Sequence, residues 1–220
     1  MAMKASRGWS LGLLLCLGTS GCKPVQLVWT VDQLEQIGGH AVEVLGAPKV
    51  VTEGSRKALC FDGVKDGIFL GANPLQGWGE FTVEILFRPD GDGNEEQRFL
   101  HIEDDEQHRL LIETRVNKDR TWSLDTFLRN TDKEKLTLLD RAKTQATDQW
   151  YWAALVYDGR TMRHFVNGEL QLEGQVDFPK TTSGRTSLGV RQNRIHWFKG
   201  CIAEVRITAM ALDPGVLSKP

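Results

Sequence analysis

The chain has 220 residues, of which 40% are hydrophobic and 25% are charged, and its formal net charge is −2. This length and composition suit one globular domain with a short extension. The sequence is mildly acidic and has no stripe of basic residues, so the electrostatic pattern of a nucleic-acid-binding protein is absent. The 22 glycines outnumber the 7 prolines, and many short apolar runs lie between turn residues, which favours an all-β domain over a helix bundle.

Residues 1–21 have the pattern of an export signal. A basic start precedes an apolar run at 9–17, which has signal-peptide length and is too short for a comfortable transmembrane helix. The Ser-Gly-Cys sequence at 20–22 then resembles the lipobox of bacterial lipoproteins, although Thr19 stands where that pattern usually has leucine. We expect an exported protein with a lipid on Cys22, held at the outer membrane or the periplasmic face of the cell envelope. An ordinary secretory signal with a coincidental cysteine is the alternative.

Export also determines the expected state of the remaining cysteines. Cys16 leaves with the signal and Cys22 is acylated, so Cys60 and Cys201 remain in an oxidising compartment where disulfides persist. In the chain-entropy model, closing so long a loop stabilises the fold by roughly 4–5 kcal/mol. The sequence favours a disulfide between these two residues, and two buried free thiols are the alternative.

The predicted elements are almost all strands. A capping-box pattern at 30–33 and the glycine pair at 38–39 predict one short helix over 32–37. After it, period-2 alternation and turn pairs predict about a dozen strands. In chain order these strands fall at 40–46, 57–63, 67–71, 80–90, 98–104, 109–116, 121–130, 135–142, 150–159, 162–168, 169–174, 184–190 and 198–212.

Such a succession of strands predicts a two-sheet antiparallel sandwich of the jelly-roll type. A sheet with one buried face needs a second sheet to cover it. We expect the signal at 1–21, a tether with the short helix at 22–36, a single β domain at 37–213 and a tail at 214–220.

Four segments resemble the LamG-like, concanavalin A-like jelly rolls and occur in the order found in that family. The segments are KALCFDGVKDGIFL, FTVEILFRPD, WYWAALVYDGRTMRHFVNGELQ and GRTSLGV followed by WFKGCIAEVRI. The resemblance covers most of the chain after residue 40. It is specific for the fold and much less so for function, because this fold hosts lectins, adhesion modules, glycosidases and lyases.

Polar residues on the strand faces opposite the core form the candidate site. The resemblance implies a ligand site on one sheet or its rim loops, and a band of carboxylates and guanidinium groups beside an aromatic ring suits a sugar. A solvated face with cross-strand ion pairs is the alternative. The expected band comprises Glu84, Glu113, Arg115, Asp125 and Arg129. The candidate aromatic rings are Trp122 and Trp197, the second in a loop with Arg191, Asn193 and His196.

Enzymatic chemistry is not expected. A glycosidase needs two carboxylates about 5–5.5 Å or about 6.5–9.5 Å apart, and the Glu-x-Asp-x-x-Glu strand typical of glycosidases with this fold is absent. Glu84 and Glu113 are the pair to test if the protein is an enzyme. The histidines form no zinc set, and neither a Gly-x-Ser-x-Gly motif nor a phosphate loop is present.

Calcium is the one cofactor that the resemblance implies. Carboxylates in turns are suitable ligands for this ion, and Asp62, Asp66, Asp90 and Asp92 lie in predicted turns. These turns lack the spacing of a dedicated calcium loop, and ordinary polar turns have the same composition.

The sequence therefore predicts an exported, lipid-anchored, non-catalytic module that binds a glycan or a surface protein at the bacterial cell envelope. A structural or protein-interaction module without a small ligand is the first alternative. A carbohydrate-active enzyme is the second.

Overall fold

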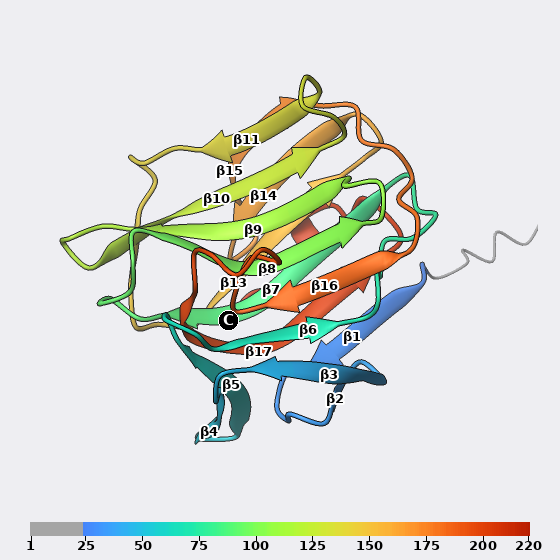
Figure 1. The fold of residues 1–220 in the computed structure, drawn as a ribbon. Coiled ribbons are helices and arrows are strands. Elements are labelled where there is room, and N and C mark those ends of the chain that lie inside the picture. The colour runs from blue at the N-terminus through green and yellow to red at the C-terminus, as the bar shows by residue number, and fades with distance from the viewer. Residues whose placement is uncertain (1–23) are drawn as a thin grey trace, which may run out of the picture.

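The computed structural model describes residues 24–220, and the predicted signal peptide with Cys22 lies outside them. Two antiparallel sheets pack against each other, and the nine-stranded sheet lies in front of the eight-stranded sheet in the view of Figure 1. The predicted all-β, two-sheet jelly-roll sandwich is confirmed. No helix in the described part of the chain has both the length and the apolar character that a membrane span needs.

The eight-stranded sheet has the order β15–β14–β13–β7–β17–β5–β4, and β1 pairs with β17. Its strands are β1 (Gln26–Thr30), β4 (Lys49–Glu53), β5 (Arg56–Asp62), β7 (Phe81–Pro89), β13 (Tyr151–Tyr157), β14 (Thr161–Val166), β15 (Glu169–Gln175) and β17 (Lys199–Thr208). The C-terminal segment, with the short 3₁₀ helix η1 (Pro214–Val216), packs on the outer face of this sheet, where Leu217 contacts Val156 and Phe165. The predicted tail is thus part of the folded domain.

The nine-stranded sheet has the order β11–β10–β9–β8–β16–β6–β3–β2, and β12 pairs with β10. Its strands are β2 (Gln36–Ile37), β3 (His40–Leu45), β6 (Gly67–Leu70), β8 (Glu96–Asp104), β9 (Arg109–Val116), β10 (Thr121–Arg129), β11 (Lys135–Leu139), β12 (Gln145–Ala146) and β16 (Gly184–Leu188). The outer face of this sheet carries the candidate site described below.

Period-2 alternation decides which side chains enter the core. In β7, Phe81 and Ile85 lie in the core between the sheets, and in β9, Leu110 and Ile112 do the same. Each such side chain stabilises the fold by roughly 1.5–3 kcal/mol when it leaves water. The residues that alternate with these core residues along each strand, including Glu113, must therefore face away from the core.

The predicted helix over 32–37 is wrong. Residues 31–35 contain a bend, and β2 pairs with β3 through a turn in which Gly38 and Gly39 have φ values of 59° and 83°. A Cβ on Gly38 would lie 2.2 Å from the Trp29 ring, and Ile37 is 1% exposed. Packing of these side chains outweighs the local helix signal, which is a weak determinant of structure. The segment expected to be a tether, 22–36, also supplies β1.

The predicted disulfide between Cys60 and Cys201 is confirmed. The two cysteines face each other in the register of β5 and β17, with their Cα atoms 4.0 Å apart. Cys201 is 1% exposed. The bond therefore fixes an early strand of the domain to its last strand.

Candidate functional site

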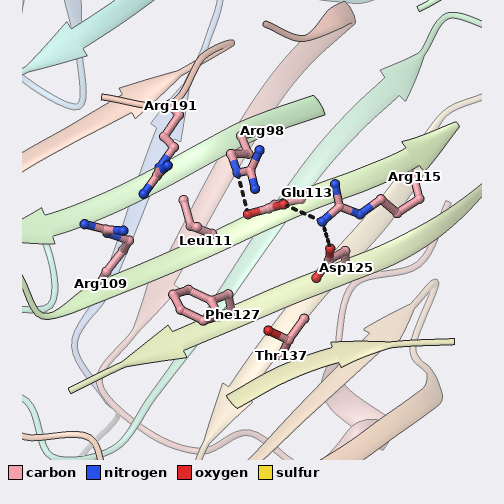
Figure 2. Close-up of a pocket in the computed structure, with 9 residues that line it drawn as sticks. All are labelled: Arg98, Arg109, Leu111, Glu113, Arg115, Asp125, Phe127, Thr137 and Arg191. Atoms are coloured by element: carbon pink, nitrogen blue, oxygen red, sulfur yellow. Dashed lines mark hydrogen bonds and ion pairs between the residues drawn. The ribbon is translucent and has the colours of Figure 1, made fainter. Parts of the chain in front are cut away.

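A depression of about 180 Å³ lies on the outer face of the nine-stranded sheet (Figure 2). Strands β8, β9, β10 and β11 and the loop 189–198, which joins β16 to β17, surround it. We call it the arginine depression because its lining includes four arginines, Arg98, Arg109, Arg115 and Arg191. Leu111, Glu113, Asp125, Phe127 and Thr137 complete the lining.

Strand register brings the charged residues of the depression together. Glu113 in β9 lies opposite Asp125 in β10 and opposite Arg98 in β8. Directly opposed side chains in antiparallel strands have Cβ atoms about 4.5–5.5 Å apart, close enough for ion pairs. The alternation that buries Leu110 and Ile112 thus builds a continuous charged surface across three strands.

The floor of the depression is a buried network centred on Arg115. Its guanidinium group contacts Asp125 and lies 3.4 Å from Glu113 Oε2 and 2.7 Å from Glu96 Oε1. Arg98 Nε donates to Glu113 Oε1 at 2.9 Å. Only 3% of the Glu113 side chain and 1% of the Asp125 side chain are exposed. We call Arg115, Glu113 and Asp125 the ion-pair floor.

Burial makes both carboxyl groups of the ion-pair floor costly to ionise. Burial, followed by the neighbouring charge of Asp125, raises the pKa of Glu113 to about 7. Burial also raises the pKa of Asp125, against the opposing influence of Arg115. Desolvation is the largest cause of both shifts, and the charges of Arg98 and Arg115 oppose it.

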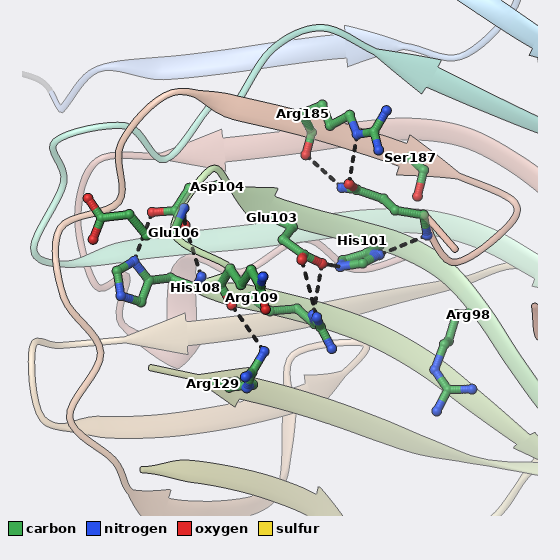
Figure 3. Close-up of polar contacts among 12 residues, drawn as sticks. Arg98, His101, Glu103, Asp104, Glu106, His108, Arg109, Arg129, Arg185 and Ser187 are labelled. Carbon is green, nitrogen blue, oxygen red and sulfur yellow. Dashed lines mark hydrogen bonds and ion pairs between the residues drawn. The ribbon is translucent and has the colours of Figure 1, made fainter. Parts of the chain in front are cut away.

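A second polar network lies beside the depression (Figure 3). Arg109 donates to Glu103 from Nε at 2.8 Å and from Nη2 at 3.2 Å. His101 Nδ1 accepts from the Gln192 backbone N–H at 3.0 Å, while its Nε2 lies 2.8 Å from Glu103 Oε2. The histidine is therefore the neutral tautomer with its hydrogen on Nε2, in agreement with the pKa of about 4 to which burial lowers it. Although burial alone would raise the pKa of Glu103, contacts with His101 and Arg109 lower it to about 2.

The side chains that a ligand could contact in the depression are different from those of the ion-pair floor. The Phe127 ring and the Arg191 side chain are half-buried, and Thr137 is exposed. Within residues 24–220, no acidic group lies within ion-pair distance of Arg191, and its guanidinium group makes no hydrogen bond. The depression thus offers an aromatic surface, a hydroxyl and a guanidinium group above a fixed floor.

Three of the predicted ligand-binding residues meet in the depression. Arg115 and Asp125 form its floor, and Arg191 reaches it from the loop 189–198. The other three do not line it. Arg129 pairs with Asp132 at 2.8 Å, Asn193 is exposed in the loop, and Trp197 is half-buried with its ring beside Gly67.

Two expectations about the site were wrong. Trp122 is not an available aromatic surface, because it is 0% exposed and packs against Phe87 and Tyr151 in the core. Glu84 is not in the band with Glu113, because it lies in β7 of the other sheet. There it accepts a hydrogen bond from the Ser218 backbone N–H at 2.7 Å on the outer face. Glu84 and Glu113 are on opposite faces of the sandwich and are not a catalytic pair.

Sequence reasoning missed Arg98, Arg109 and Phe127. Alternation could have predicted Arg109 and Phe127. Arg109 lies an even number of residues from Glu113 on β9, and Phe127 lies an even number from Asp125 on β10, so each shares a strand face with a predicted site residue. Alternation could not predict the face of Arg98, because the strand register shifts between Arg98 and Leu100 in β8. Such a bulge redirects a side chain without a clear sequence signal.

The aspartates proposed for calcium make local contacts. Asp62 Oδ1 accepts three backbone N–H groups, those of Val64, Lys65 and Asp66, and Asp66 Oδ1 accepts that of Ala47. Asp92 pairs with Lys199 at 2.6 Å, and Asp90 lies 3.6 Å from Arg88. In the part of the chain that the structure describes, no group of three or more His, Cys, Asp or Glu residues could hold a metal ion. Calcium binding stays a prediction.

The chain belongs to the concanavalin A-like lectin/glucanases superfamily. The model of its family Laminin_G_3 matches residues 62–216, which agrees with the two-sheet sandwich and with the resemblance seen in the sequence. A comparison with curated protein sequences found no match.

Solved structures with the same fold include carbohydrate-binding and receptor-binding domains. One is domain 4 of AbnA, a GH43 extracellular arabinanase from Geobacillus stearothermophilus, in complex with arabinotriose, with a TM-score of 0.64, 20% identity and coverage of 88% of this chain and 96% of that one. Another is the binding domain of botulinum neurotoxin DC in complex with SialylT, with a TM-score of 0.62, 13% identity and coverage of 86% and 49%. The receptor-binding domain of botulinum neurotoxin D has a TM-score of 0.60, 13% identity and coverage of 86% and 50%. The chain thus spans about half the length of the neurotoxin domains, and these likenesses concern the fold.

Proposed function

We propose that the protein is a non-catalytic module that binds a glycan in the arginine depression. The observation that carries this proposal is that the half-buried Phe127 ring and the guanidinium group of Arg191 line one depression together with the ion-pair floor. A sugar ring has an apolar C–H face that packs on an aromatic ring and hydroxyl groups that exchange hydrogen bonds with charged side chains. The arabinotriose complex of AbnA domain 4 supports such a use of this fold.

The ion-pair floor suits binding because it fixes the geometry of the depression before a ligand arrives. Arg115 contacts carboxylates on β8, β9 and β10 and so connects three strands. A site held in its bound shape loses less entropy when the ligand binds, which leaves more of the contact energy as affinity.

Replacing Phe127 with alanine should weaken glycan binding about tenfold or more. The ring is the one aromatic group in the lining of the depression, and truncation of an aromatic anchor typically costs more than 1 kcal/mol, with about 1.4 kcal/mol corresponding to tenfold. The measurement is a glycan-array screen of the purified chain, followed by isothermal titration calorimetry with the oligosaccharides that bind. Each titration is repeated with calcium and with a chelator, which tests the calcium prediction.

The matched control is Leu170→Ala, which truncates an apolar side chain that is 48% exposed on β15 of the other sheet. This variant should bind as the parent does. Equal affinity of the Phe127→Ala variant and the parent would contradict binding in the arginine depression. A blank array from folded protein would contradict glycan binding altogether and favour a module that recognises a surface protein.

One observation favours a glycoside hydrolase as the second candidate function. Glu113 and Asp125 are adjacent carboxyl groups, and a pKa of about 7 for Glu113 suits a general acid. Their burial argues against it, because both side chains are at most 3% exposed and their oxygens face Arg98 and Arg115. Oligosaccharides that bind should therefore stay intact on long incubation, whereas cleavage that disappears in the Glu113→Gln variant would establish the enzyme.

We further propose that the chain is exported and anchored by a lipid on Cys22, at the outer membrane or the periplasmic face of the bacterial cell envelope. The basic start, the apolar run and the Ser-Gly-Cys sequence at 20–22 support this proposal. Mass spectrometry of the protein expressed in a bacterium should find Cys22 at the N-terminus with two or three acyl chains. An unmodified Cys22 in the exported protein would contradict the anchor.

A further inference from the structure

The four arginines of the depression differ in how their charges are compensated. Arg115 contacts three carboxylates, Arg98 contacts Glu113 and Glu96, and Arg109 binds Glu103 through two nitrogens. Arg191 alone of the four lacks an acidic group within 4.0 Å among residues 24–220. One cation of the site is therefore left without a direct ion-pair partner, although Glu103 and Glu113 lie near enough to compensate part of its charge.

Arg191 is also held where other cations surround it. In Figure 2 its guanidinium group points toward that of Arg109, and Arg98 lies at the same end of the depression. Burial, followed by the like charges of Arg109 and Arg98, lowers the pKa of Arg191, although an arginine still carries its charge at any physiological pH. Like charges gathered in a partly buried place destabilise the unliganded protein, and an anion would relieve that cost.

The loop 189–198 fixes Arg191 in this position. Arg194 and His196 have φ values of 61° and 57°, which are uncommon for residues other than glycine and are held by surrounding contacts. The contacts include hydrogen bonds from the Arg98 backbone N–H to the His196 carbonyl at 2.9 Å and from the Gln192 backbone N–H to His101 Nδ1 at 3.0 Å. The side chain of Arg191 thus emerges from a loop that is fixed to β8.

We infer that the glycan bound in the arginine depression carries an anionic substituent and that Arg191 is the residue that binds it. The inference rests on the proposed function and specifies the class of glycan. A guanidinium group binds a carboxylate or a sulfate through two parallel hydrogen bonds, which are roughly twice as strong as bonds between neutral groups. The Phe127 ring, also in the lining, would pack on the sugar to which the anion is attached.

The test is titration of the purified chain with three probes of similar length. They are trigalacturonate, which carries carboxylates, a sulfated carrageenan tetrasaccharide, and neutral arabinotriose. At low salt we expect at least one acidic probe to bind about tenfold or more tightly than the neutral one, since a hydrogen bond to a charged group contributes more than one between neutral groups. That preference should shrink as salt is raised, because ions screen partly exposed charges. The two acidic probes distinguish a uronic acid from a sulfate ester.

Arg191→Gln should abolish this preference, because it weakens binding of the acidic probe much more than binding of the neutral probe. The matched control is Arg194→Gln, which removes the same charge from the same loop at a side chain that is 60% exposed and does not line the depression. Arg191→Lys keeps the charge without the planar fork and should retain part of the preference. Circular dichroism confirms that each variant is folded.

Three outcomes overturn the inference in distinguishable ways. If the neutral probe binds as tightly as both acidic probes, with no dependence on salt or on Arg191, the inference is wrong and glycan binding stands. If none of the probes and none of the glycans on the array binds, the proposed function falls and the inference falls with it. A preference for an acidic probe that survives in Arg191→Gln would assign the anion to another residue and would also overturn it.

Discussion

Replacing both Cys60 and Cys201 with alanine should lower the free energy of unfolding by about 4–5 kcal/mol. The bond closes a loop with a sequence separation of 141, and in the chain-entropy model such a loop restricts the unfolded chain strongly. It also connects β5 to β17, so its loss leaves these two strands held by backbone pairing and packing alone. Urea unfolding of the oxidised parent and the variant measures the difference in free energy, provided that the dependence of that free energy on urea concentration is the same for both.

The control for this variant is the parent protein after reduction, which loses the same covalent bond without a change in sequence. Reduced parent and Cys60→Ala/Cys201→Ala should unfold at similar urea concentrations. If the variant matches the oxidised parent instead, the loop-closure argument does not apply. In that case the pairing of β5 with β17 would hold these strands together unaided.

Much of the fold was predictable because period-2 alternation of apolar and polar residues indicates strands. The run from Phe81 to Phe87 places alternate apolar side chains in the core, as expected. What alternation cannot supply is the identity of the sheet in which a strand lies. Glu84 was correctly expected to face away from the core, yet β7 lies in the eight-stranded sheet and Glu113 in the other. Sheet membership depends on long-range pairing, which local sequence does not encode.

The site was predictable along each strand and less so across strands and loops. Trp122 and Asp125 differ in parity on β10, so the pattern already placed the tryptophan on the core side and Phe127 on the site side. The bulge that turns Arg98 into the depression and the backbone of the loop that carries Arg191 have no comparable pattern. Alternation revealed residues of the floor, whereas the places of Arg98 and Arg191 in the lining depend on the three-dimensional structure.

Arg115→Met should lower the free energy of unfolding by roughly 3–5 kcal/mol at pH 8, since removal of one partner leaves buried charges without compensation. The methionine keeps most of the apolar contacts of the arginine, which is 8% exposed. Glu113 and Asp125 would then lie side by side without the cation that both contact. Urea unfolding of parent and variant at pH 5 and pH 8 measures the loss.

The sign of the pH dependence separates this electrostatic account from a packing account. A carboxyl group whose folded pKa is raised destabilises the fold as pH rises from its unfolded pKa to its folded pKa, because ionisation then favours the unfolded chain. For Glu113 that window runs from 4.5 to about 7 in the parent, and loss of Arg115 extends it upward. The variant should therefore be close to the parent at pH 5 and much less stable at pH 8.

The matched variant is Arg115→Met with Glu113→Gln and Asp125→Asn, which removes the cation and both carboxylates together. It should recover much of the stability at pH 8 and lose the pH dependence, since no ionisable group remains in the floor. An equal loss at both pH values, without recovery in the triple variant, would mean that Arg115 acts through packing. The charges of the ion-pair floor would then not fix the geometry of the depression, and the preorganisation argument for glycan binding would lose its basis.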